Sequence, residues 1–236
     1  NRLEKAMYSH SAPLIWMHCS SLGEFEQGRP LLEMVKENHP SHKILITFFS
    51  PSGYEIRKNY EGADFVFYLP ADSKSNARRF LQIVKPVLVL WVKYDYWYYY
   101  LSTLRQNNIP VLLVSGLFRI DQPFFKWYGK LYRQMLESFR HLFVQTESSA
   151  QLLKSIGFVN NVTIVGDTRF DRVLQISRHF EPIDDIKQFC GNDPVIVAGS
   201  TWIEDEEELD HYANTRQEIE RLEPPLRDRD GDCGRR

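Results

Sequence analysis

A glutamate beside a group of small residues is the first candidate for chemistry in this sequence. Glu24 ends the segment His18-Cys19-Ser20-Ser21-Leu22-Gly23-Glu24, in which Ser20, Ser21 and Gly23 allow the backbone to turn sharply after an apolar run. Amides at the start of a following helix would favour an anion there. A carboxylate in the same place can take the proton from a hydroxyl group. The alternative interpretation is structural, because a helix dipole also favours an acidic residue in the first turn.

Polar residues also follow two later apolar runs. Ser50, Ser52 and Gly53 follow the second run, where they either cap a helix or present its amides to a ligand. Lys93 and Asp95 follow the fourth run among aromatic residues, which either stack on sugar rings or pack in the core. Each of these positions therefore has both a functional and a structural interpretation.

The last apolar run is followed by Arg169, which either binds a phosphate or carboxylate or is neutralised by Asp167 and Asp171. Residues 124–130 mix aromatic rings with Lys126 and Lys130, as in a membrane-surface patch or an amphipathic crossover helix. The motif G-x-G-x-x-G does not follow the first run, and G-x-x-x-x-G-K-S/T does not occur. Nicotinamide-binding and P-loop functions are therefore disfavoured.

Seven short apolar runs would position these residues, and each has the length of a strand: 14–19, 44–49, 65–69, 87–92, 111–114, 142–145 and 162–165. Segments of helical period alternate with them, among them 30–37, 76–84, 128–139 and 148–156. Nearly unbroken hydrophobic strands separated by helices predict a doubly wound parallel sheet of the α/β class. In such a sheet, ligands bind beyond the carboxyl ends of the strands.

Composition narrows the function further. The chain has 236 residues, 43% of them apolar, which is enough for a sizeable core. Its formal net charge of -2 excludes a global field that would hold nucleic acid. Three widely spaced cysteines argue against a disulfide framework or a zinc site, and we expect neither a metal nor a cofactor.

The chain also divides along its length. We predict a first domain over 13–176, a linker over 177–193, and a strand at 195–198 that leads into Gly199, Ser200 and Thr201. Residues 194–209 would then be the truncated start of a second domain. Residues 210–236 are highly charged and include Pro224-Pro225, so we expect an aberrant or disordered tail there.

Five segments, in this order and spacing, resemble the 3-deoxy-D-manno-octulosonic acid (Kdo) transferase family. They are His18-Cys19-Ser20-Ser21-Leu22-Gly23-Glu24-Phe25, Phe48-Phe49-Ser50-Pro51-Ser52-Gly53-Tyr54-Glu55, Lys93-Tyr94-Asp95-Tyr96-Trp97, Gly166-Asp167-Thr168-Arg169-Phe170-Asp171 and Ala198-Gly199-Ser200-Thr201. The resemblance covers about 13–209. It implies two Rossmann-like domains of the GT-B type, the first for a lipid acceptor and the second for the donor CMP-Kdo.

The resemblance further implies a metal-independent, inverting transfer of Kdo to lipid IVA, the lipid A precursor, at the cytoplasmic face of the inner membrane of a Gram-negative bacterium. Glu24 matches the family's catalytic base, and Asp95 matches a second acidic position that is usually Glu. Trp202 stands where the family often has His. The remaining matches imply acceptor contacts at Ser20, Ser21, Gly23, Ser50, Ser52, Gly53 and Lys93, and donor contacts at Arg169, Gly199, Ser200 and Thr201.

Most of the donor pocket would lie in residues that this sequence does not contain, so we expect this chain to be an inactive fragment of such an enzyme. Two alternatives remain open. One is a non-catalytic module that binds a phosphorylated glycolipid acceptor, and the other is a different GT-B glycosyltransferase that uses a nucleotide-diphosphate sugar.

Overall fold

The computed structural model describes residues 2–8, 11–93, 95–178, 180–191, 195 and 197–222. The chain forms two compact units, Asn1–Phe180 and Glu181–Arg236. The division falls close to the predicted end of the first domain at residue 176. All residues of the candidate site except Gly199, Ser200 and Thr201 belong to the first unit.

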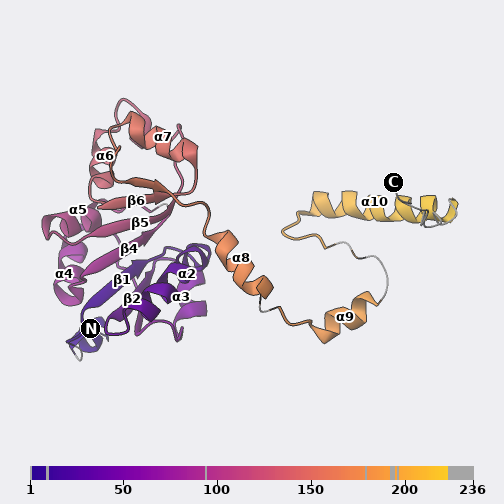
Figure 1. Cartoon of the computed structure of the whole chain (residues 1–236), viewed down its shortest axis with the longest axis horizontal. Helices are drawn as coiled ribbons and strands as arrows, with labels where there is room; N and C mark the ends of the chain where they lie inside the picture. Colours follow the sequence, from indigo (N-terminus) through magenta and orange to yellow (C-terminus); the bar gives the residue numbers. More distant parts are fainter. Residues whose placement is uncertain are drawn as a thin grey trace, which may run out of the picture. The chain divides into compact units, whose positions relative to one another are not determined.

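The first unit is built on a seven-stranded parallel sheet with the order β3-β2-β1-β4-β5-β6-β7 (Figure 1). All seven strands predicted from the sequence are present. They are β1 (Leu14–His18), β2 (Lys43–Phe48), β3 (Phe65–Tyr68), β4 (Leu88–Val92), β5 (Val111–Gly116), β6 (His141–Val144) and β7 (Val162–Ile164). The strand order reverses between β1 and β4, so the connections after these two strands lead to opposite faces. Sheets of this type bind ligands at such a topological switch point, which we call the crevice.

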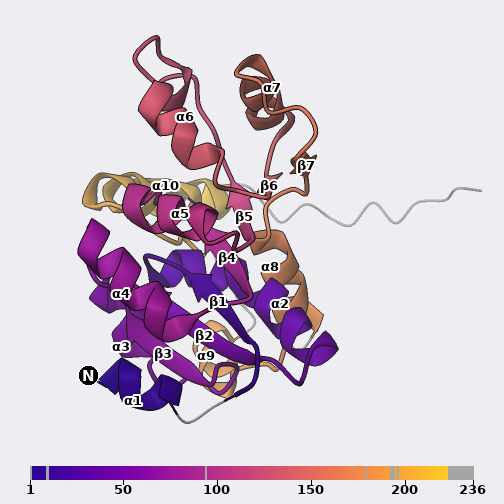
Figure 2. The same cartoon turned by 90° about the vertical axis from the view of Figure 1, so that its left-hand side faces the viewer.

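Helices cover both faces of this sheet, as Figure 2 shows for α4 and α5 on one side and α2 and α8 on the other. One face carries α1 (Arg2–Tyr8), α4 (Lys74–Val84), α5 (Tyr98–Gln106), α6 (Lys130–Leu136) and α7 (Glu147–Ser155). The other carries α2 (Leu22–Asn38), α3 (Pro51–Arg57) and, packed on α2, α8 (Arg169–Arg178). A short 3-10 helix, η1 (Pro123–Phe125), precedes α6. The doubly wound α/β architecture is confirmed.

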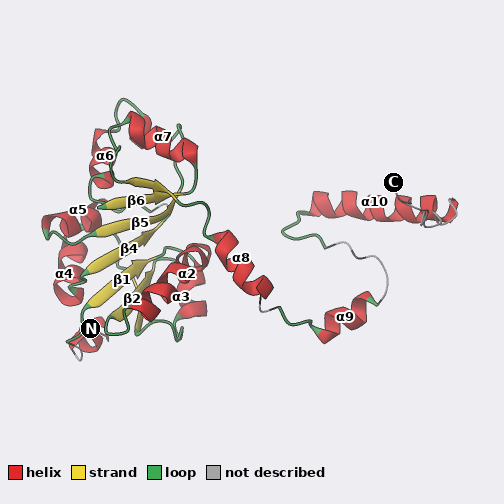
Figure 3. Ribbon diagram, in the orientation of Figure 1, coloured by secondary structure: helices red, strands yellow, loops and turns green. Residues whose placement is uncertain are grey.

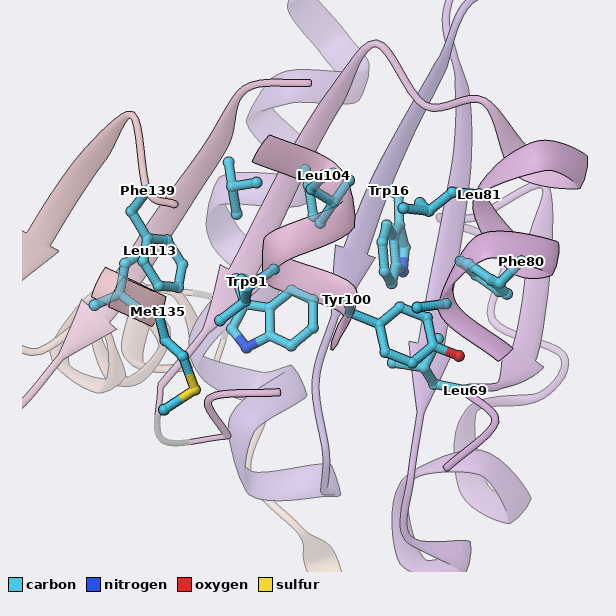
Figure 4. Packing of buried hydrophobic residues seen from close by; sticks show 14 of the residues in the cluster. Trp16, Leu69, Phe80, Leu81, Trp91, Tyr100, Leu104, Leu113, Met135 and Phe139 are labelled. Atoms are coloured by element: carbon cyan, nitrogen blue, oxygen red, sulfur yellow. The ribbon is translucent and has the colours of Figure 1, made fainter. Parts of the chain in front are cut away.

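Alternation along each strand explains why both faces are covered. In β1, Trp16 packs on the face of α4 and α5, whereas Ile15 and Met17 pack on the face of α2. Figure 4 shows Trp16 and Trp91 of neighbouring strands beside Tyr100 of α5, and the ring of Trp16 contacts both of the others. Full burial of a large apolar side chain stabilises a fold by about 1.5–3 kcal/mol, so these two layers hold the strand ends in place.

Helix α2 begins earlier than the segment 30–37 predicted for it. It starts at Leu22, is capped by Ser21, and contains Pro30 in its interior. Proline removes one helical hydrogen bond and usually ends or bends a helix, so a start at residue 30 was the natural expectation. Burial of Phe25 and Leu32 on either side of Pro30 offsets this cost. The consequence is that Glu24 lies in the first turn of α2.

The second unit differs from the prediction. Its described helices are α9 (Asp184–Cys190), inside the predicted linker, and α10 (Ile203–Leu222), which includes residues 210–222 of the predicted disordered tail. Acidic residues in the first turn of α10 interact favourably with the helix dipole, which stabilises the helix. Val195, Val197 and Ala198 have no strand structure, since a strand needs a paired neighbour for its backbone groups. Pro194, Ile196 and residues 223–236 lie outside the described residues.

Candidate functional site

The site lies at the crevice between the connections that follow β1 and β4. All strands are parallel, so their carboxyl ends meet at one edge of the sheet (Figure 3). The β1–α2 connection supplies Ser20, the first turn of α2 supplies Glu24, and the β4–α5 connection supplies Lys93 and Asp95. Tyr94 lies outside the described residues. The two predicted catalytic carboxylates thus come from the segments that follow two neighbouring strands, β1 and β4.

Ser20 joins the two carboxylates. Its backbone N–H donates to Glu24 Oε2 over 2.5 Å, and its hydroxyl donates to Asp95 Oδ2. Ser21 does what its residue type suggests at a helix start, since its side chain accepts a hydrogen bond from the Glu24 N–H over 3.4 Å. Ser21 therefore caps α2, as its residue type suggests, whereas Ser20 donates hydrogen bonds to both carboxylates.

Glu24 is half-buried, and its surroundings suit a general base. Burial is the main cause that raises the pKa of the Glu24 carboxyl to about 7, and the charge of Asp95 raises it further. The amides of Ser20 and Ser21 and the charge of Lys93 oppose this rise. A base is most effective when its pKa lies near the working pH, so the structure gives this carboxylate a value suited to proton transfer at neutral pH.

Lys93 ends β4 in a left-handed conformation, with φ at 60°. Its N–H donates to Val114 O over 3.0 Å, which fixes the backbone at the carboxyl end of β4. This conformation costs a residue with a side chain about 1–2 kcal/mol. Burial, followed by the charge of Arg169, lowers the pKa of the Lys93 ammonium, while Asp167 and Glu24 raise it. Strained residues of this kind concentrate at functional sites.

Arg169 reaches the same region from the start of α8. Its side chain is paired with Asp167, with Nε and Nη2 at 2.8 and 2.5 Å from Oδ2. This hydrogen bond is the main cause that lowers the pKa of the Asp167 carboxyl. The structural interpretation of Arg169, neutralisation by a nearby aspartate, is therefore realised in this structure. An anionic ligand of Arg169 would have to compete with Asp167.

The β2–α3 connection touches the site through its backbone. Ser50 N donates to Ser20 O over 2.7 Å, which ties this connection to the β1–α2 connection. Ser50 also caps α3, since its side chain accepts from the Ser52 N–H over 3.3 Å. Gly53 is buried, and an added Cβ would overlap the ring of Phe48. Gly53 therefore serves packing in this structure, and its contact with an acceptor stays a prediction.

The two predicted site glycines are expected to respond differently to alanine. Gly53→Ala should lower the free energy of unfolding by about 1–3 kcal/mol, because the Phe48 ring has to move. Gly23→Ala should raise it by up to about 1 kcal/mol, because Gly23 lies in α2 with nothing within 4 Å of an added Cβ. Urea denaturation of both variants measures the difference. Equal changes in the free energy of unfolding would contradict the packed position of Gly53 and the open position of Gly23.

Residues that the sequence analysis quoted without assigning a role also lie at the site. Phe49 is 51% exposed and its ring lies 5.0 Å from that of Trp97, centroid to centroid. His18 is fully buried, and its ring nitrogens contact Thr47 Oγ1 at 3.0 Å and Ser20 Oγ at 3.4 Å. Its place two residues before Ser20 was visible in the sequence. Its partner Thr47 was not, because the contact depends on the pairing of β1 with β2.

Gly199, Ser200 and Thr201 belong to the second unit. Ser200 has φ at 61°, and Thr201 Oγ1 donates to Glu206 Oε1 over 2.9 Å. Their approach to a donor stays a prediction. Among the residues that the structure describes, no group of three or more His, Cys, Asp or Glu side chains is placed to hold a metal ion.

Comparison with known families gives a match over most of the first unit. A family model described as the N-terminal glycosyltransferase domain of 3-deoxy-D-manno-octulosonic-acid transferase (kdotransferase) matches residues 1–172. This range contains Glu24, Asp95, Lys93 and Arg169, and it extends to the first turn of α8. The match therefore includes every described contact of the crevice.

Curated relatives agree with this match. A bifunctional glycosyltransferase/methyltransferase of Fusobacterium nucleatum is 29% identical over 226 residues, which cover 91% of this chain and 34% of that protein. A 3-deoxy-D-manno-octulosonic acid transferase of Haemophilus influenzae is 24% identical over 193 residues, covering 79% and 44%. One from Aquifex aeolicus is 26% identical over 158 residues, covering 66% and 40%. The chain thus spans between a third and a half of the length of these relatives.

Solved structures resemble the fold. A UDP-GlcNAc 2-epimerase from Methanocaldococcus jannaschii has a TM-score of 0.57 at 16% identity, over 89% of this chain and 62% of that one. Another UDP-N-acetylglucosamine 2-epimerase has a TM-score of 0.56 at 18% identity, over 78% and 56%. At such identity the likeness concerns the fold alone, and it confirms a Rossmann-like domain of the GT-B type.

Proposed function

The chain belongs to the Kdo transferase family, and we propose from this membership that it supplies the acceptor side of a transfer of Kdo from CMP-Kdo to lipid IVA in lipopolysaccharide biosynthesis. The observation that carries the proposal is Glu24, a half-buried carboxyl whose pKa burial raises to about 7 at the crevice between β1 and β4. Parallel sheets bind ligands at such a crevice, and a glycosyl transfer needs a base there.

In the proposed reaction, the Glu24 carboxylate accepts the proton of the attacking glucosamine 6′-hydroxyl of lipid IVA. The acceptor oxygen forms a bond to the anomeric carbon of Kdo, and the bond from that carbon to the CMP phosphate oxygen breaks. CMP leaves with the bonding electrons, so charge develops on its phosphate, where cationic and amide groups stabilise it. Ser20 holds Glu24 through its backbone N–H during proton transfer.

Two features beside the crevice suit an acidic, amphipathic acceptor. Lys93 brings positive charge towards Glu24, Arg169 lies close enough to act on Lys93, and phosphate groups of lipid IVA would find partners there. Phe49 and Trp97 offer rings on which a sugar can stack. A bound phosphate would draw Arg169 away from Asp167. Acceptor binding is therefore expected to depend on the charge of Arg169 and on that of Asp167, which competes for it.

An exposed aromatic surface suggests how the chain meets a lipid substrate, at what we propose to be the cytoplasmic face of the inner membrane. Trp127 is 94% exposed, and Tyr128, Leu131 and Tyr132 are exposed beside it around the start of α6. Lys126 and Lys130 add positive charge to this aromatic surface. Rings that enter the headgroup region beside lysines bind anionic lipid. No helix among the described residues has both the length and the apolarity to cross a bilayer.

Binding to lipid membranes tests this surface. Replacing Trp127 and Leu131 together with Ser should reduce co-sedimentation of the chain with phosphatidylglycerol vesicles by about tenfold, because two exposed apolar side chains that would enter the lipid are lost. Tyr8→Ser is the control, since Tyr8 is 96% exposed on α1, outside the aromatic surface. Equal retention of both variants on vesicles would remove the membrane proposal.

Titration with lipid IVA tests the proposed function. We expect saturable binding to the chain, weakened by Phe49→Ala, with no binding of a dephosphorylated lipid of the same acyl content. Kdo transfer from CMP-Kdo is assayed separately, and binding without turnover would favour the non-catalytic module. In a polypeptide that does turn over, inhibition by UDP but not by CMP would favour the alternative glycosyltransferase. Absence of lipid IVA binding would contradict the proposal.

A further inference from the structure

Five side chains form a continuous series of polar contacts from the core to the crevice. Trp16 Nε1 lies 2.8 Å from Thr47 Oγ1, which lies 3.0 Å from His18 Nδ1. His18 Nε2 lies 3.4 Å from Ser20 Oγ, and Ser20 Oγ contacts Asp95 Oδ2. Trp16, Thr47 and His18 are fully buried, so their hydrogen bonds have no competition from bulk water.

The chemistry of each group assigns the protons of this series. An indole N–H only donates, so Thr47 Oγ1 accepts from Trp16. An ionised carboxylate only accepts, so Ser20 uses its single hydroxyl proton on Asp95. Ser20 Oγ then accepts from His18, which places the imidazole proton on Nε2. His18 Nδ1 is left as an acceptor, and the Thr47 hydroxyl is the group that donates to it.

Burial keeps His18 in the neutral form that this arrangement requires. It lowers the pKa of the imidazole to about 3, although a hydrogen bond with the Thr47 backbone opposes the shift. The rings of Trp91 and Trp97 lie 4.6 and 5.4 Å from that of His18, centroid to centroid, and hold it in place. A neutral histidine has one donor and one acceptor nitrogen, which gives the series a direction.

We propose that Trp16, Thr47 and His18 form a one-way hydrogen-bond chain that fixes the Ser20 hydroxyl as a donor to Asp95, which makes His18 and Ser20 positioning residues for the two carboxylates. The consequence for catalysis rests on the proposed function, whereas the assignment of protons does not. Ser20 is the point where the chain meets the site, because its N–H also donates to Glu24. The hydrogen-bond chain therefore holds Asp95 beside Glu24.

The charge of Asp95 contributes to the raised pKa of Glu24, so the hydrogen-bond chain also affects the protonation of the proposed base. The titratable and charged groups that face Glu24 are Cys19 on its own connection and Lys93 and Asp95 across the crevice. From the start of α8, Asp167 and Arg169 act on Lys93. Among these described groups, the Asp95 carboxylate is the one that accepts the Ser20 hydroxyl proton.

Nitrogen NMR of the chain labelled with 15N-histidine tests the proton assignment without any substrate. We expect one histidine, identified by its loss in His18→Gln, to carry its proton on Nε2 and to stay neutral from pH 8 to pH 5. Thr47→Val should abolish the fixed Nε2–H form. A proton on Nδ1 of His18, or titration in the ordinary range, would overturn the inference.

The effect on Glu24 is measured by carboxyl 13C NMR in variants of the partly buried Ser20 and Ser21, which leave the core side chains unchanged. Ser20→Ala should lower the pKa of Glu24 by roughly 0.5–1 unit, because Asp95 is no longer held beside it. Ser20→Thr keeps the hydroxyl and should restore the wild-type value. Ser21→Ala is the matched control, since it removes the side-chain cap of α2 and leaves the hydrogen-bond chain intact.

An unchanged Glu24 pKa in Ser20→Ala would overturn the positioning role. These measurements also separate this inference from the proposed function. A correct His18 tautomer in a chain that binds no lipid IVA would contradict the function alone, whereas a wrong tautomer in a chain that binds it would contradict the hydrogen-bond chain alone.

Discussion

Replacing Glu24 with Gln is expected to lower Kdo transfer by about 100- to 10,000-fold, because the amide cannot accept the proton of the attacking hydroxyl. The wild-type kcat/KM should rise with pH up to about 7 and level off above, since the base acts only when ionised and burial raises its pKa to about 7. The loss should fall on kcat, because the amide keeps the shape of the side chain and with it most of the acceptor contacts.

Transfer is measured with the chain and, if the chain alone shows no turnover, with the chain fused to the CMP-Kdo-binding half of a relative. Glu137→Gln makes the same change of charge on the surface, where Glu137 is paired with Arg105, and should leave transfer unchanged. Retained turnover in Glu24→Gln would show that another group takes the proton. A pH profile that stays flat between pH 5 and 8 would contradict the raised pKa.

The same substitution should stabilise the fold at alkaline pH. The pKa of Glu24 is about 7 in the folded chain against an ordinary value of 4.5, so the folded state binds more protons than the unfolded state between these values. Stability is therefore lost as pH rises from about 4.5 to about 7 and stays low above that. Glu24→Gln removes this loss, which has an upper limit of about 3 kcal/mol.

Urea denaturation at pH 5 and pH 8 measures this effect on the chain itself. The variant and the wild type should unfold at similar urea concentrations at pH 5, and the variant should unfold at a higher concentration at pH 8. Asp64→Asn gives the opposite sign, because the pKa of Asp64 is lowered, on balance, by Lys43 and the Ile44 amide against burial. If Glu24→Gln were no more stable than the wild type at pH 8, the claim that the ionised Glu24 carboxylate destabilises the fold would be wrong. Such a cost is typical of functional sites.

Much of the first unit follows from local patterns in the sequence. The apolar runs that contain Trp16, Leu45 and Trp91 are short and continuous, because strands buried on both faces leave no polar position, and so all seven strands were predictable. The polar residues that follow them had to meet at one edge, because parallel strands end together. The prediction that Glu24 and Asp95 lie at this edge therefore needed no coordinates.

The second unit shows where local patterns were insufficient. Residues 195–198 have the composition of a strand, yet the described residues among them form none, because pairing with a neighbour decides whether a strand exists. Residues 210–222 are charged and were expected to be disordered, yet they continue α10. Charge content alone does not distinguish an exposed helix from a disordered segment, so the pattern could not reveal α9 or α10.

The sequence by itself determined the class of fold, the edge of the sheet that carries the site and the residue types available there. Only the tertiary structure decided which of them meet: Ser20 with Asp95 across 75 positions, His18 with Thr47 across 29, and Arg169 with Asp167. Such contacts depend on the strand order and on the course of each connection. The pKa of Glu24 depends in turn on burial and on those neighbours, and neither is a property of residue 24 alone.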